Sequence, residues 1–266
     1  MKKLPWLIAI LLVVAAAVLV LRSRQPVPPP AVVETPEAPE TAAPELPVPV
    51  TEAPPPVEQV EVTEPAEPLP PLDESDADVR AEAVDLVGTQ AVASFLVSPE
   101  IVRKLVVTVD NLPRDKVAMR LRSVTEMPGR FVASGPEDAM VLDAGNFVRY
   151  RPFVDLVSSM DAVQAAAAYR HFYPLLQQAY EDLGYPGEPF HYRVIECIDD
   201  MLDAPEVGAG ARLIRPKVLY EFADPGLEAR SAGQKMLMRM GPENARIVKT
   251  KLRELRAALA APAGPG

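Results

Sequence analysis

The part of the chain with the most side chains suited to binding or catalysis is residues 169–193. It holds five of the seven tyrosines and both histidines. Tyrosine suits both a half-buried core and a cleft for sugars or peptides, because its apolar ring carries a polar hydroxyl. We expect Tyr169 and Tyr180 to pack at the edge of a core. The alternative is an exposed surface for a partner or a glycan, for which the candidate binding residues are Arg170, His171, Tyr173 and Arg193.

A second candidate is the short basic corner Arg215-Pro216-Lys217. A guanidinium group can hold a carboxylate or a phosphate through two parallel hydrogen bonds. Arg215 and Lys217 therefore complete the set of candidate ligand-binding residues. The alternative is an internal ion pair between this corner and one of the many acidic side chains.

Residues 190–203 are predicted to form a helix with one apolar face and one acidic face. Cys197 shares the apolar face with Val194, Ile198 and Met201, so it is interpreted as a buried side chain that packs as a small hydrophobe. The opposite face could bind a cation or take part in acid–base chemistry, but it is typical of a solvated surface. Its acidic residues are Glu196, Asp199, Asp200 and Asp203.

The sequence predicts no catalytic residue, no metal site and no cofactor. Two histidines and one cysteine are too few for most zinc sites. Gly208-Ala209-Gly210 follows a helix, and Leu213 stands where a dinucleotide fingerprint needs its third glycine. No Gly-x-Ser-x-Gly elbow of a serine hydrolase occurs either.

The elements that position these residues are predicted to form a mainly α, compact helical domain over residues 72–262, followed by a flexible tail at 263–266. Apolar residues recur at helical spacing through most of this region. Asp161 is expected to cap a helix whose apolar face includes Leu183, and Pro174 is expected to kink that helix. The predicted helices cover 75–87, 92–96, a segment that starts at Ser98-Pro99-Glu100 and has an apolar stripe from Ile101 to Val109, the region 137–183, and 190–203, 225–240 and 242–260. The last two are expected to join at Gly241-Pro242.

One segment alternates apolar and polar residues instead. Residues 117–133, around Met127-Pro128-Gly129-Arg130, predict a small β-hairpin. Residues 204–216 are expected to form a loop. Together these segments add a small β component to a helical fold.

The first 24 residues predict a single transmembrane anchor. Residues 4–21 are apolar throughout, and 18 residues at a rise of about 1.5 Å reach about 27 Å, which matches the hydrocarbon core of a bilayer. The alternative is a cleaved signal peptide, but the run ends in Val-Leu-Arg-Ser-Arg instead of a cleavage site. The basic residues on the two sides of the apolar run, Lys2 and Lys3 before it and Arg22 and Arg24 after it, nearly balance and do not fix the orientation. The short basic N-terminus and the long acidic remainder favour a C-terminal domain outside the cytoplasm.

Residues 25–71 are predicted to be a disordered Pro/Glu-rich linker. They contain 16 of the 31 prolines, nine glutamates and no lysine or arginine. Proline favours an extended polyproline II conformation, in which 47 residues could span about 150 Å. Such a linker indicates that the domain works at a distance from the membrane. The following residues 72–266 carry 28 acidic and 23 basic side chains, which argues against non-specific nucleic-acid binding.

Several motifs of the predicted domain, taken together, resemble a known family. They include the Asp110-Asn111-Leu112-Pro113 turn and Gly184-Tyr185-Pro186, and they continue through Arg215-Pro216-Lys217 and Ser231-Ala232-Gly233-Gln234-Lys235. Over residues 70–262 the chain resembles the bacterial domain-of-unknown-function family 3014. The resemblance implies a short N-terminal span, a variable proline-rich arm and this domain, and it implies no activity.

Two functional hypotheses follow from these observations. The first is a non-enzymatic binding or scaffolding module in the bacterial inner membrane, single-pass, whose periplasmic domain holds an envelope protein or a cell-wall component. A sensor or chaperone of exported proteins fits the same features. The second is an enzyme acting on cell-envelope material, which requires His171 and Arg193 to share a concave pocket.

Overall fold

The computed structural model of the protein describes residues 68–96, 99–115 and 129–261. The predicted anchor, the predicted linker up to residue 67, most of the predicted hairpin and the predicted tail lie outside these residues. None of the helices within the described ranges has the length and hydropathy needed to cross a membrane.

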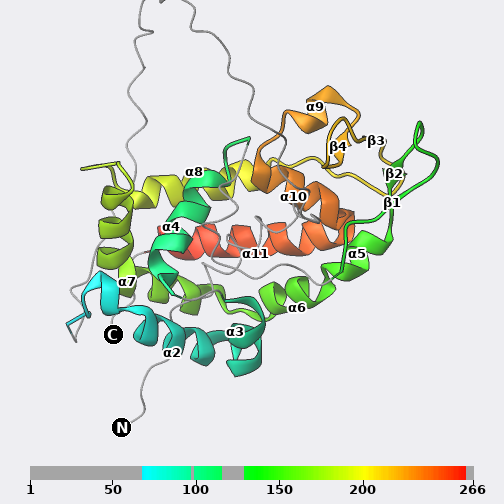
Figure 1. Ribbon diagram of the computed structural model, residues 1–266. Coiled ribbons are helices and arrows are strands. Elements are labelled where there is room, and N and C mark those ends of the chain that lie inside the picture. Colours follow the sequence, from blue (N-terminus) through cyan, green and yellow to red (C-terminus); the bar gives the residue numbers. More distant parts are fainter. Residues whose placement is uncertain (1–67, 97–98, 116–128, 262–266) are drawn as a thin grey trace, which may run out of the picture. The chain divides into compact units, whose positions relative to one another are not determined.

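The described part of the chain is mainly helical and includes two small two-stranded sheets (Figure 1), which confirms the predicted helical domain at this level. The elements are η2 (Leu72–Glu74), α2 (Asp76–Val87), α3 (Thr89–Phe95), α4 (Ile101–Asn111), β1 (Ala133–Ser134), β2 (Val141–Leu142), α5 (Gly145–Arg149), α6 (Arg151–Ser159), α7 (Ala162–Asp182), α8 (Phe190–Leu202), β3 (Leu213–Ile214), β4 (Glu221–Phe222), α9 (Pro225–Glu228), α10 (Ala232–Met240) and α11 (Pro242–Ala260).

Helix α4 buries the predicted apolar stripe but begins later than predicted. Glu100 has a φ of 62°, in the left-handed region, and is therefore outside the helix. The carboxylate of Asp76, on α2, accepts hydrogen bonds from the backbone N–H groups of Glu100 and Ile101, both at 2.7 Å. The first N–H groups of a helix have no partner within it and favour a negative charge. An acid from another helix therefore caps α4, in place of a local Ser-Pro-Glu start.

The region 137–183 is not helical throughout, because β2 lies near its start and three helices follow. Asp161 caps α7 as predicted: its carboxylate accepts from the N–H groups of Val163 and Gln164, both at 2.9 Å. Helix α7 continues past Pro174 to Asp182. Leu183 follows the end of the helix and is 38% exposed, so its predicted place on the buried face is wrong.

Helix α11 lies at the centre of the bundle, against α6, α7, α8 and α10 (Figure 1). The predicted joint before it is confirmed, since Gly241 has a φ of 86° and Pro242 is the first helical residue. The predicted helix 225–240 is instead two helices, α9 and α10. Ser231 separates them, because its hydroxyl accepts a hydrogen bond from the N–H of Gln234 at 3.1 Å and so caps α10.

The two sheets form a second, smaller core beside the bundle. Strand β1 pairs antiparallel with β2, and β3 pairs antiparallel with β4. A bridge between Val141 and Arg212 joins the two pairs. Of the predicted hairpin, only Ala133 lies in a described strand, and β3 lies in the predicted loop. The buried side chains of this second core are Leu142, Val207, Leu213, Phe222 and Met238.

Candidate binding pocket between α4 and α8

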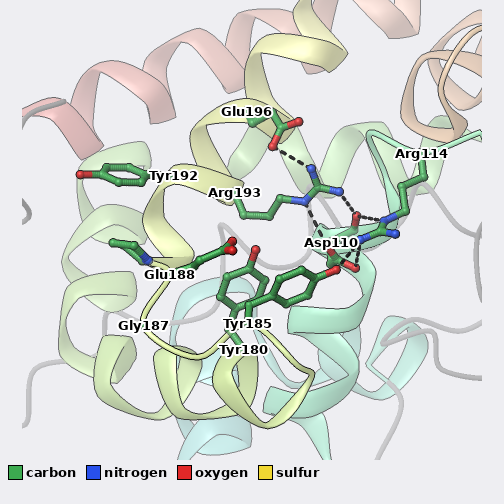
Figure 2. A pocket seen from close by; sticks show the side chains of 10 residues that line it. Asp110, Arg114, Tyr180, Tyr185, Gly187, Glu188, Tyr192, Arg193 and Glu196 are labelled. Atoms are coloured by element: carbon green, nitrogen blue, oxygen red, sulfur yellow. Dashed lines mark hydrogen bonds and ion pairs between the residues drawn. The ribbon is translucent and has the colours of Figure 1, made fainter. Parts of the chain in front are cut away.

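A pocket of about 480 Å³ lies where the end of α4 meets the α7–α8 connection and the first turns of α8 (Figure 2). Pockets of this size suit a side chain or a small ligand. The lining mixes tyrosine rings with charged groups of both signs. It consists of Asp110, Arg114, Tyr180, Tyr185, Gly187, Glu188, Pro189, Tyr192, Arg193 and Glu196.

The floor of the pocket is formed by two stacked tyrosine rings. Tyr180, near the end of α7, and Tyr185, in the following turn, have ring centroids 4.5 Å apart and planes 14° apart. Gly187 allows the chain to turn back here, because its φ of 78° is costly for other residues. The Gln177 amide group donates to the carbonyl of Glu188 at 2.9 Å and so ties this turn to α7.

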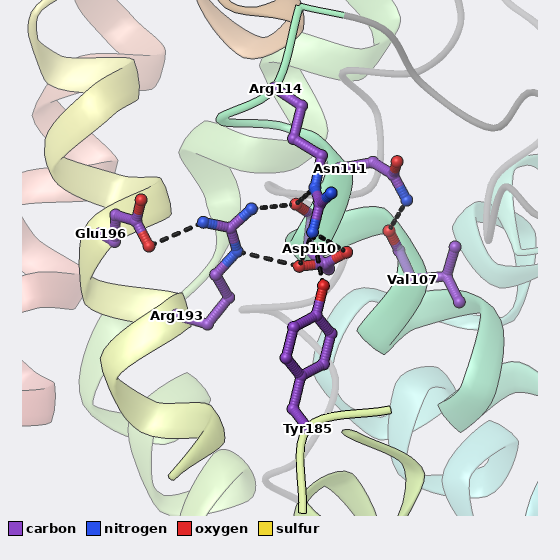
Figure 3. A network of polar contacts seen from close by, with 7 residues as sticks. All are labelled: Val107, Asp110, Asn111, Arg114, Tyr185, Arg193 and Glu196. Carbon is purple, nitrogen blue, oxygen red and sulfur yellow. Dashed lines mark hydrogen bonds and ion pairs between the residues drawn. The ribbon is translucent and has the colours of Figure 1, made fainter. Parts of the chain in front are cut away.

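One wall of the pocket is a network of charged side chains centred on Asp110 (Figure 3). The side chain of Asp110 is only 7% exposed. Its carboxylate accepts hydrogen bonds from Nε of Arg193 at 3.1 Å and from Nη2 of Arg114 at 3.0 Å. The other side of the Arg193 guanidinium donates to Glu196 at 2.7 Å, and Nη2 of Arg114 donates to the hydroxyl of Tyr185 at 2.5 Å. The network therefore joins α4, the turn and α8.

The position of Asp110 explains why two arginines meet there. A negative charge in the last turn of a helix is unfavourable, because the free carbonyl groups already make this end negative. Both arginines also donate to the backbone carbonyl of Asp110, Arg114 through Nε at 3.1 Å and Arg193 through Nη2. They thus neutralise the carboxylate and cap the helix end at once.

The pKa values of both arginines follow from these contacts. For Arg193, burial acts to lower the pKa, but the hydrogen bond and charge of Glu196 and the charge of Asp110 together raise it. For Arg114, the hydrogen bond that it donates to Asp110 is the main reason that the pKa rises. Both groups stay charged and paired, which makes this wall rigid and electrically balanced.

The floor and the remaining side of the pocket contain groups with fewer partners. Tyr180 is 4% exposed, and its hydroxyl makes no hydrogen bond within the described part of the chain. Burial, followed by the charges of Asp110 and Glu188, raises its pKa to about 12, so the hydroxyl stays protonated at neutral pH. Figure 2 shows this hydroxyl and the Glu188 carboxylate both pointing into the pocket, with Tyr192, which is 43% exposed, beyond them.

Of the residues proposed from the sequence, Arg193 alone lines this pocket. It is half-buried and ion-paired, and Tyr173 is buried, so the predicted exposure of both is wrong. The reason for Tyr173 is its place on the inner face of α7, where its hydroxyl donates to Gln177 at 3.1 Å. His171 also lies on α7, with its ring against the edge of Phe172, outside the lining.

Arg170 has a structural contact far from the pocket. Its Nη2 donates to the carbonyl groups of Ala258 and Ala261, both at 2.6 Å, at the C-terminal end of α11. Arg215 and Lys217 are exposed on the β3–β4 turn. The Arg215 guanidinium lies 5.7 Å from the centroid of the Tyr220 ring, and neither residue makes an ion pair with a described residue. Arg170, His171 and Tyr173 thus lie on α7 and Arg215 and Lys217 on the β3–β4 turn, and none of these five candidates lines the pocket with Arg193.

His191 and Cys197, the side chains near the pocket best suited to react with a ligand, are both buried in the core. As expected, Tyr169 and Tyr180 are buried; the Tyr169 hydroxyl lies 3.2 Å from Nδ1 of His191, which is itself buried. Burial, then the charge of Arg170, lowers the pKa of His191. Cys197 is fully buried on α8, and burial raises the pKa of its thiol. Neither group lines the pocket, so neither is placed to react with a ligand there.

The acidic face of α8 is used for contacts between helices. Asp199 pairs with Arg256 of α11 at 2.6 Å, and Asp200 accepts from the Ser231 hydroxyl at 2.6 Å and from the Gln234 amide group at 2.9 Å. Across residues 68–96, 99–115 and 129–261, no group of three or more His, Cys, Asp or Glu side chains is arranged to hold a metal ion.

Residues 101–256 match a family described as "Protein of unknown function (DUF3014)". The chain belongs to the DUF3014 family. The matched region contains the whole lining of the pocket, from Asp110 to Glu196, and it confirms the family resemblance seen in the sequence motifs. Searches among curated proteins and among solved structures each gave no match.

The lining residues other than Arg193 were not among the binding candidates from the sequence, and those missed include Asp110, Arg114, Tyr180, Glu188 and Tyr192. One feature of the sequence could have indicated the network, because Asp110 and Arg114 have the i, i+4 spacing of a helical ion pair. Arg193 lies 83 residues from Asp110 in the chain, and no local pattern relates them. The pocket of this DUF3014 domain therefore arises from the meeting of α4 and α8.

Proposed function

We propose that this DUF3014 protein is a non-enzymatic binding module of the bacterial envelope, with a partner-binding pocket between α4 and α8. In this proposal residues 1–24 anchor the chain in the inner membrane, and the Pro/Glu-rich residues 25–71 hold the domain away from the bilayer. The apolar run and the proline content support these two parts.

The observation that carries the binding role is the state of the pocket's polar groups. The Asp110–Arg193–Glu196 side is already paired and rigid, which suits recognition because no side chain has to be reordered when a ligand enters. Tyrosine side chains supply the remaining surface, and tyrosine is enriched where proteins bind partners. The histidine and cysteine of α8 lie in the core instead.

Site-specific photo-crosslinking tests this function. A photoreactive phenylalanine analogue at Tyr192, which is exposed at the pocket, is compared with the same analogue at Val163, which is 71% exposed on α7. In intact cells we expect a discrete crosslinked product from Tyr192 only, and a lower yield of that product when Tyr180 is also changed to Phe. Identical products from both positions would show that the pocket is not the binding surface.

The proposed location has its own test. A C-terminal fusion to a reporter that is active only outside the cytoplasm should be active, and the protein should remain in the membrane fraction after high-salt washing. Activity only of a cytoplasmic reporter would reverse the proposed orientation.

A further inference from the structure

We propose that the ligand of this pocket is a cationic side chain, lysine or arginine, presented by a segment of a partner polypeptide. The inference deepens the proposed binding function and rests on it. It depends on three features of the lining: its charge balance, the Tyr180 hydroxyl, and the exposed ring of Tyr192.

The charges of the lining leave one carboxylate without a partner. Three carboxylates and two guanidinium groups line the pocket. Arg193 pairs with Asp110 and Glu196, and Arg114 pairs with Asp110. Glu188 uses its backbone carbonyl to bind Gln177, but its carboxylate makes no ion pair with a described residue. A cation is the ligand group that completes this balance, and the net charge of −10 on the chain favours its approach.

Tyr180 can contact a ligand through its hydroxyl oxygen but not through the face of its ring, which is covered by neighbouring side chains. Tyr185 stacks on one side of its ring, and Phe190 packs against it with centroids 5.2 Å apart. Its side chain is more than nine-tenths buried, yet the hydroxyl points into the pocket without a hydrogen-bond partner in the described residues (Figure 2). A phenol oxygen accepts hydrogen bonds from an ammonium or a guanidinium group, as does the neighbouring Glu188 carboxylate.

Tyr192 completes the site at the rim. Its ring is 43% exposed and can lie against the aliphatic stem of a lysine or arginine, or against the cationic head. Tyr180 and Tyr185 stack on each other, so Tyr192 is the most exposed tyrosine that the lining offers to a ligand. The Glu188 carboxylate and the Tyr180 hydroxyl favour the charged head of a linear side chain over a neutral glycan. Figure 2 shows Tyr192 and Arg114 at opposite sides of the pocket, so the entering cation is kept away from the less buried arginine.

The test is an NMR titration of the full chain in neutral detergent with acetyl-Gly-Lys-Gly-amide. We expect binding with a Kd on the order of 1 mM, as suits one side chain, with shifts at the amide groups of Gly187 and Tyr192. The arginine peptide should bind as well, whereas the norleucine and glutamate peptides should not. Raising the salt concentration should weaken binding, because the rim is open to solvent.

Matched variants test the residues. Glu188→Gln should weaken the lysine peptide about fivefold to tenfold, and Tyr180→Phe about threefold. Glu137→Gln removes an exposed acid of the β1–β2 turn, outside the lining, and should leave the Kd unchanged. Equal effects of Glu188→Gln and Glu137→Gln, or equal binding of the lysine and norleucine peptides, would overturn the inference. A glucosamine trimer that binds while the peptides do not would also overturn it in favour of an amino-sugar ligand.

The outcome also separates this inference from the proposed function. If the basic peptides fail but Tyr192 still gives its discrete crosslinked product, the ligand class is wrong and the binding module stands. If the peptides bind in the pocket and Glu188→Gln weakens both peptide binding and the crosslinked product, the two proposals are supported together.

Discussion

Asp110 should be the most sensitive charged residue of this domain, and Asp110→Asn measures its contribution. The substitution keeps the shape and one acceptor oxygen but removes the charge that faces Arg193 and Arg114. Breaking a buried ion pair costs about 3–5 kcal/mol, because the remaining charge is left without a partner. The Arg193 side chain is 14% exposed and retains Glu196, and the Arg114 side chain is 46% exposed and can turn to water. We therefore expect the free energy of unfolding to fall by about 2–3 kcal/mol.

The assay is urea unfolding at neutral pH, followed by far-ultraviolet circular dichroism. Asp155→Asn is the matched control, because Asp155 pairs with Arg151 at 3.6 Å on the surface of α6, with side chains 67% and 57% exposed. Such a pair contributes about 0.5 kcal/mol or less. The slope of the free energy of unfolding against urea concentration should be the same in both variants, as expected if each unfolds by the same reaction as the native chain.

A double-mutant cycle separates the pair from its surroundings. Arg193→Gln and the double variant with Asp110→Asn are measured in the same way. Since the two groups are in contact, the cost of the double variant should fall short of the sum of the single costs by at least about 1 kcal/mol. A loss in Asp110→Asn no larger than in Asp155→Asn, or strictly additive costs, would refute the assignment of Asp110 as the buried carboxylate that holds α4 to α8.

Three other predictions concern the rest of the fold. Arg170→Ala removes the guanidinium that binds the carbonyls at the end of α11, so we expect the free energy of unfolding to fall by about 1–2 kcal/mol and amide exchange in the last turn of α11 to become faster. The Arg170→Lys variant should have a stability between those of the native chain and Arg170→Ala. Unchanged amide exchange in Arg170→Ala would contradict this role. Burial raises the pKa of Asp200 in the folded protein, so its contribution to stability is greatest below its unfolded pKa of about 3.9 and is lost as the pH rises through the folded pKa. Asp200→Asn should therefore gain stability relative to the native chain as the pH rises above about 3.9, and parallel curves would count against this pKa shift. Gly241→Ala should cost more than about 2 kcal/mol in urea unfolding, because a Cβ there would lie 2.6 Å from the Phe147 ring at a φ of 86°, whereas Gly208→Ala meets nothing within 4 Å and should be nearly neutral.

The helices follow from the sequence wherever a long apolar stripe meets a clear end signal. Helix α8 occupies nearly the predicted range, with Cys197 and Met201 on its buried face, and α11 starts at the predicted Gly241-Pro242 joint. In these segments the apolar stripe and the residues that end the helix lie close together in the sequence, so both can be predicted from local patterns. The same local reasoning was wrong at the start of α4, where the cap comes from another helix.

The pocket and the roles of the charged residues were decided by tertiary contacts. The sequence already indicated a mildly acidic helical domain, with five of its seven tyrosines in residues 169–193. It could not indicate that Arg193 would meet Asp110, or that Arg170 would meet Ala261, 91 positions further along the chain. The sequence does not distinguish an exposed arginine from a paired one. Whether an arginine is paired depends on whether tertiary packing brings the carbonyl groups of a helix end or a carboxylate beside it. The residue types of the pocket were thus set by the chain, and their arrangement into a site by the packing of α4, α7 and α8.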